Sequence, residues 1–136
     1  MQHTIADGVY TLSFRDPSAS SGEDGAGVAI VRGSCIIGSD PGGCIINGRL
    51  TQRHDTGTGP EAIFEGSIFV PPESELITGQ SAGPKGLSLR VRATAIACGS
   101  RVSFLADVNG HAIDVNAFYV GPLPLATGPK GAAVRP

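Results

Sequence analysis

Gly33-Ser-Cys-Ile-Ile-Gly-Ser-Asp-Pro-Gly-Gly-Cys-Ile-Ile-Asn-Gly48 is the stretch that decides the fold. Two Cys-Ile-Ile runs flank a centre rich in Gly and Pro, and β-branched runs bounded by such residues are typical of strands. Pro41 presets φ at the second position of a turn, and Gly42 can take the positive φ that a type II turn requires next. Because a type II turn splays the strands of a minimal hairpin, we expect a longer loop, from Gly38 to Gly43. The stretch therefore predicts an antiparallel hairpin.

Length and composition favour one all-β domain. The chain has 136 residues, 40% of them hydrophobic, which is enough for a core without metal or disulfide support. Its 20 glycines and 10 prolines favour many turns and short strands over helices. The formal net charge is −2, and no basic stripe is present, which disfavours binding to nucleic acid.

Targeting signals are also missing from the sequence. No segment has the length and apolar character of a membrane-spanning helix. The first eight residues lack the charged and apolar regions of a signal peptide. An odd count of 3 cysteines suits a reducing compartment. We therefore expect a cytoplasmic protein that does not contact a membrane.

Period-two alternation of apolar and polar residues continues along the rest of the chain. Asn109-Gly110 is the strongest signal for a two-residue hairpin, because a type I′ turn needs positive φ at both positions. In the clearest strand the expected inward residues are Leu87, Leu89, Val91, Ala93 and Ala95. The other expected strands cover 8–14, 27–31, 44–50, 62–70, 102–108 and 112–120, with a short edge segment over 74–77.

Eight or nine strands joined mostly by short turns predict one architecture. A meander of this size usually removes its exposed edges by forming an up-and-down barrel or a sandwich, and we favour the barrel because the strand order looks sequential. We expect a single closed, or nearly closed, antiparallel up-and-down β-barrel in residues 1–123. Residues 124–136 are rich in Pro and Gly and are expected to form a C-terminal tail.

No residue pattern indicates catalysis, a bound cofactor or a metal. His3, His54 and His111 form no short-spaced ligand pair, so we interpret them as solvated. The chain has no Gly-x-Ser-x-Gly motif, and its Gly-x-Gly sequences open no helix that could hold a phosphate. We therefore expect that the protein is not an enzyme.

Cys35 and Cys44 lie on opposite arms of the predicted hairpin. A cross-strand disulfide is geometrically allowed if the register pairs them directly. Otherwise both behave as small buried hydrophobes, which is the interpretation that we favour.

Short glycine-based motifs along the chain carry a family resemblance. They are Asp7-Gly-Val-Tyr-Thr-Leu-Ser-Phe14, Gly25-Ala-Gly-Val-Ala-Ile-Val31, Gly38-Ser-Asp40, Ile46-Asn-Gly48, Gly86-Leu-Ser-Leu-Arg-Val91 and Ile113-Asp-Val-Asn-Ala-Phe-Tyr-Val-Gly-Pro-Leu123. Together they resemble the GrlR family of bacterial negative regulators of type III secretion. The resemblance implies a small lipocalin-like barrel that forms a homodimer. It also implies a regulator that sequesters a transcriptional activator by protein contact, without catalysis.

The same resemblance directs attention to the segment after the fourth strand. In the family an acidic surface run at this place contacts the activator. Here the corresponding stretch, 49–59, has one acid and two arginines. We take it as the candidate partner-binding loop, with the residues Arg49, Arg53, His54 and Asp55.

Two classes of function stay open. A regulator that acts by protein contact predicts a filled barrel with an exposed patch or a dimer face. A carrier predicts an open cavity for an apolar, lipid-like ligand. The aromatic residues expected to line such a cavity are Tyr10, Phe14, Phe64 and Phe104.

Overall fold

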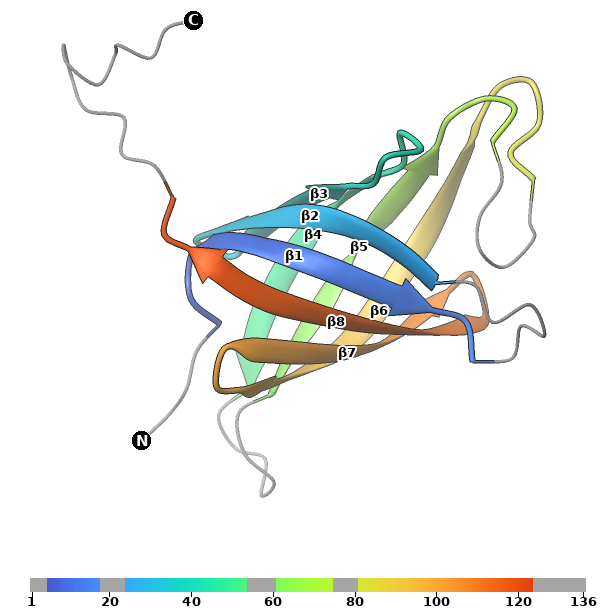
Figure 1. Cartoon of the computed structure of the whole chain (residues 1–136). Helices are drawn as coiled ribbons and strands as arrows, with labels where there is room; N and C mark the ends of the chain where they lie inside the picture. The colour runs from blue at the N-terminus through green and yellow to red at the C-terminus, as the bar shows by residue number, and fades with distance from the viewer. Residues whose placement is uncertain (1–4, 18–23, 54–60, 75–80, 124–136) are drawn as a thin grey trace, which may run out of the picture.

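Antiparallel strands form a single closed barrel (Figure 1). The computed structural model describes residues 5–17, 24–53, 61–74 and 81–123. The strands are β1 (Gly8–Arg15), β2 (Asp24–Arg32), β3 (Cys35–Ser39), β4 (Ile45–Arg53), β5 (Glu61–Val70), β6 (Leu87–Cys98), β7 (Arg101–Val108) and β8 (His111–Gly121). Each strand pairs with the next one in the chain, and β8 returns to pair with β1. The predicted up-and-down barrel is therefore confirmed, with eight strands. Within the described ranges, no helix is long and apolar enough to cross a membrane.

The second strand begins earlier than its apolar run predicts. β2 starts at Asp24 rather than at Gly27, and Gly25 pairs with Phe14 of β1. A Cβ atom at Gly25 would overlap the Phe14 ring, so only glycine leaves room for this ring. The predicted loop before Gly27 therefore includes strand residues. Strand pairing extends to this point because Gly25 leaves space for the Phe14 ring of the neighbouring strand.

The fourth strand continues into the loop that was predicted over 51–60. Thr51, Gln52 and Arg53 pair with Ile63, Ala62 and Glu61 of β5. Ladder hydrogen bonds use backbone groups, so polar side chains do not end a strand that has a partner. The predicted edge segment 74–77 lies mostly outside the described residues, as does the tail 124–136.

The turn of the opening hairpin differs from the prediction. The loop covers 40–44, and Gly43 rather than Gly42 has a positive φ, of 94°. The Gly43 N–H donates a hydrogen bond to the Asp40 carbonyl oxygen, at 3.0 Å. A type I turn followed by a glycine with positive φ accounts for this geometry, so the type II expectation was wrong. The type I′ expectation is confirmed at Asn109 (φ 54°) and Gly110 (φ 88°).

Side chains alternate between the interior and the outer surface along the strands. In β6, Leu89, Val91, Ala93 and Ala95 are buried, whereas Arg90 and Arg92 are exposed. Many inward residues of the barrel are small. They include Ala29, Ala62, Ala93, Ala95, Ala106 and Ala117.

A buried carboxylate links the two strands that close the barrel. Asp16 follows β1 and is only 3% exposed, and its Oδ2 lies 2.7 Å from Nε2 of His111, the first residue of β8. Figure 1 shows β1 and β8 side by side. His111 keeps contact with solvent, since its side chain is 42% exposed, but the pairing of β1 with β8 also brings it to Asp16, a contact that the sequence did not predict. His3 and His54 lie outside the described residues.

Glycine is also required where β4 and β5 lie side by side in the barrel wall. Gly48 and Gly66 are register partners. A Cβ atom on Gly66 would lie 2.7 Å from Cα of Gly48 and would overlap the carbonyl oxygen of Asn47. Both are backbone atoms, so a side chain at Gly66 would force the two strands apart.

We therefore expect Gly66→Ala to lower the free energy of unfolding by about 1–3 kcal/mol, a usual cost of overpacking. Urea denaturation followed by circular dichroism measures this change. The matched control is Ser67→Ala, since Ser67 is the next residue and is exposed on the outer face. An unchanged midpoint for Gly66→Ala would contradict the close approach of the two strands.

Candidate ligand-binding cavity

A cavity of about 170 Å³ lies inside the barrel. Its wall is mostly aliphatic and aromatic, and every strand contributes to it. The residues Tyr10, Phe14, Phe64 and Phe104 all line it. For scale, an engineered apolar cavity of about 150 Å³ binds benzene. The interior of this barrel therefore has room for a molecule slightly larger than benzene.

Small residues explain why this space is open. An eight-stranded barrel is just wide enough for its side chains to fill, or for one small ligand. Here the wall includes Ala29, Ala93, Ala106 and Ala117, together with Gly38. The aromatic rings occupy part of the interior, and the alanines leave the remaining space.

Tyr10 presents its ring rather than its hydroxyl group to the cavity. The hydroxyl donates a hydrogen bond to the carbonyl oxygen of Ala6, at 2.6 Å. Its ring also packs edge-on against Tyr119, with centroids 5.5 Å apart. Burial raises the pKa of Tyr10, and Tyr119 and Asp7 act in the same direction. The Tyr10 phenol is therefore neutral, and its hydroxyl group already has a partner.

The other end of the cavity carries Asp40 and Cys44. Asp40 follows β3 and continues the inward series Ile36, Gly38, Asp40. Its Oδ1 accepts a hydrogen bond from the Cys44 N–H, at 3.0 Å, and the Asp40 N–H donates to the Cys44 carbonyl oxygen, at 3.2 Å. Burial, followed by the charge of Asp40 and a hydrogen bond with its side chain, raises the pKa of the Cys44 thiol to about 11.

The sequence assigned Asp40 only to a turn. The period-two alternation of Ile36 and Gly38 was the signal that could have placed its side chain inside. The alternation was not extended to Asp40 because Asp-Pro-Gly-Gly is also a strong turn sequence, and the residue was therefore assigned to the turn alone.

The two hairpin cysteines face opposite sides of the barrel wall. Cys35 is exposed and pairs in register with Arg32 and Arg49, whereas Cys44 is buried. Both are free thiols, so the structure contains no disulfide between them. The expectation of a small buried hydrophobe is therefore right for Cys44 and wrong for Cys35. Alternation along the hairpin turns Cys44 to the interior and Cys35 to the outer surface.

The candidate partner-binding loop is only partly described. Arg49 lies exposed on the outer face of β4, in a strand rather than a loop. Arg53 ends that strand, and its side chain lies outside the described part, as do His54 and Asp55. The arrangement of these four residues as one site therefore lies outside the described part of the chain.

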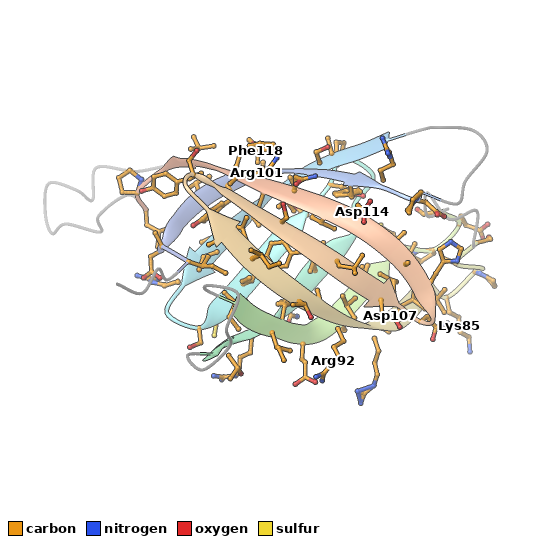
Figure 2. The ribbon with its side chains drawn as sticks, turned by 90° about the horizontal axis from the view of Figure 1, so that it is seen from below. Lys85, Arg92, Arg101, Asp107, Asp114 and Phe118 are labelled. Atoms are coloured by element: carbon orange, nitrogen blue, oxygen red, sulfur yellow. The ribbon has the colours of Figure 1, made fainter. Side chains whose placement is uncertain are left out.

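Charged side chains form a band on the outer wall beside Arg49. Arg49 is opposite Glu65, and Glu65 Oε2 lies 2.5 Å from Nη1 of Arg92. Figure 2 shows Arg92 pointing away from the barrel. Both members of this pair are 63% exposed, so it stabilises the fold by about 0–1 kcal/mol.

A group of exposed apolar side chains lies on the outer faces of β2 to β5. We call it the outer patch, and its side chains are between 40% and 59% exposed. Ile30 pairs with Ile37, and Ile45 pairs with Phe69, so the side chains are neighbours across the strands. The members of the outer patch are Val28, Ile30, Ile37, Ile45 and Phe69.

No group of three or more His, Cys, Asp or Glu side chains that could hold a metal ion occurs among the described residues. No protein-family model matches the chain, and no curated protein matches its sequence. The cavity and the outer patch are therefore the features from which a function can be inferred.

The two hairpin thiols are expected to differ strongly in reactivity. The thiolate is the reactive form, so at pH 8 a thiol with a pKa of about 11 is ionised in only about one molecule in a thousand. Iodoacetamide at pH 8 should therefore label Cys35 and leave Cys44 unmodified, as measured by mass spectrometry of tryptic peptides. Labelling of Cys44 should appear after unfolding in urea. Equal labelling of both cysteines in the folded protein would show that Cys44 is not buried.

Proposed function

We propose that the protein binds a small apolar molecule inside its barrel. The observation that carries this proposal is the cavity of about 170 Å³, which is lined by aromatic and aliphatic side chains from all eight strands. Removal of apolar surface from water would drive the binding. A few polar groups in a largely apolar site are typical of small-molecule pockets, and Asp40 and Cys44 have this role here.

A variant that fills the cavity tests this proposal. Ala106 is buried and lines the cavity, so Ala106→Leu would occupy part of its volume. We expect isothermal titration with ethylbenzene to show binding by the wild type and binding weaker by about tenfold or more in the variant. Ethylbenzene should also raise the melting temperature of the wild type, because a ligand of the folded state stabilises it.

The matched control for this titration is Ala112→Leu. Ala112 is exposed on the outer face of β8, one strand away from Ala106. This variant should bind ethylbenzene as the wild type does. If neither the wild type nor the control binds ethylbenzene or any hydrocarbon of similar size, the proposal is wrong.

The outer patch favours a second candidate function, contact with another protein. Contiguous exposed aliphatic side chains on a folded domain often mark an interaction site. The resemblance to the GrlR family points to a homodimer, and to a transcriptional regulator as the protein partner. This candidate uses the outside of the wall, whereas ligand binding uses the inside, and the two proposals can be tested separately.

We expect analytical ultracentrifugation to give the mass of a dimer for the wild type at micromolar concentration. Ile37 is 59% exposed in the outer patch, so Ile37→Lys would place a charge in the contact and should give a monomer. The control is Thr94→Lys, since Thr94 is exposed on β6, away from the outer patch. If the wild type is a monomer at this concentration, the proposed homodimer is wrong.

A further inference from the structure

Among the described residues, Asp40 is the one charged side chain in the cavity wall. Tyr10 and Cys44 are the other titratable residues that line it, and both have a raised pKa, so both are neutral at pH 7. A half-buried carboxylate beside an apolar space is costly unless a partner offsets its charge. The charge of Asp40 therefore bears directly on which ligand the cavity accepts.

Asp40 has no cation beside it in the described part of the chain. The close contacts between acidic and basic side chains found there join Arg92 to Glu65 and His111 to Asp16. The hydrogen-bond donors to the Asp40 side chain are the backbone N–H and the thiol of Cys44, which are both neutral. Within the described part of the chain, the carboxylate thus has partners that hold its position but none that cancels its charge.

The barrel wall leaves room for a ligand group next to this carboxylate. Phe14 of β1 and Asp40 after β3 both line the cavity, and β2 lies between them. The β2 residues on this path are Gly25 and Gly27, where the Phe14 ring and the Ser39 backbone, respectively, fill the space that a Cβ atom would take. No side chain of β2 therefore separates the aromatic ring from the carboxylate. A ligand ammonium group in this cavity would have a carboxylate and aromatic rings in the wall around it, and both attract cations.

The opposite end of the cavity does not compete for a polar group. The Tyr10 hydroxyl already donates to Ala6, and the neighbouring wall residues Ile5 and Val31 are aliphatic. A ligand with one polar end would therefore bind in one direction, with its apolar body toward Tyr10. A ligand that carries a carboxylate, such as a fatty acid, would meet repulsion at Asp40.

We infer that the preferred ligand is a small apolar amine, whose ammonium group contacts Asp40 while its hydrocarbon body fills the barrel. This inference rests on the proposed binding of a small molecule in the cavity. It adds the chemical class of the ligand, its direction in the barrel and the residue that selects it.

Isothermal titration of the full chain at pH 7 with three matched probes tests the inference. Benzylamine carries the ammonium group, ethylbenzene has the same number of non-hydrogen atoms and no charge, and benzoate carries the opposite charge. The variant is Asp40→Asn, which removes the charge and keeps an oxygen to accept the Cys44 N–H. The control is Asp7→Asn, since Asp7 is exposed at the other end of the barrel, where its Oδ1 accepts the Gly33 N–H at 3.0 Å.

In the wild type, benzylamine should bind more tightly than benzoate by about tenfold or more, as expected for a charge-assisted contact. Asp40→Asn should weaken benzylamine by a similar factor and leave ethylbenzene unchanged, whereas Asp7→Asn should change neither. The comparison of benzylamine with benzoate needs no variant. It therefore tests the preference for an ammonium group even if Asp40→Asn does not fold.

The possible failures can be distinguished. If ethylbenzene binds but benzylamine shows no advantage over benzoate, the role of Asp40 is wrong and the binding cavity stands. Equal losses of benzylamine affinity in Asp40→Asn and Asp7→Asn would also overturn the inference, because they would indicate an effect of net charge. If none of the three probes binds, both the inference and the proposed function fail.

Discussion

The pairing of β1 with β8 is the contact on which the rest of the structure depends. These strands are the first and last of the meander, and their ladder converts an open sheet into a barrel. Without it both strands would present unpaired backbone groups, and the inward side chains would face water. A contact between side chains marks each end of this ladder. Asp16 meets His111 at one end, and Tyr10 packs against Tyr119 at the other.

Barrel closure also determines the structural effect of the small inward residues in this chain. In an open sheet an alanine is simply a weakly hydrophobic residue. In a closed barrel of eight strands, inward alanines and glycines leave volume that no other element can fill. The cavity is thus a consequence of Ala29, Ala93, Ala106 and Ala117 facing a common axis together with four aromatic rings. Glycine has a second role at Gly25 and Gly66, where a Cβ atom would overlap a ring or the neighbouring backbone.

Inward and outward side chains alternate along each strand, and this alternation places the two candidate sites on opposite sides of the barrel wall. Ile36 and Cys44 face inward and belong to the cavity, whereas Ile37 and Ile45 face outward and belong to the outer patch. A shift of one residue in register would exchange these sets. The turns at Gly43 and Asn109-Gly110 help to hold the register, because their backbone geometry allows only one alignment of the adjoining strands. The same alternation explains why Cys35 and Cys44, although both lie in Cys-Ile-Ile runs, cannot meet.

The sequence by itself determined most of the strands, their sequential order and the Asn109-Gly110 hairpin, because alternation and turn chemistry are local properties of the chain. It also identified Tyr10, Phe14, Phe64 and Phe104 as inward aromatic residues, since each belongs to an alternating run. Only the tertiary structure decided the size of the cavity, because that volume depends on side chains from eight strands at once. It alone placed Asp40 at the end of the cavity and joined Asp16 to His111, which are 95 residues apart. Such contacts depend on barrel closure and register, and neither can be read from the residues around one position.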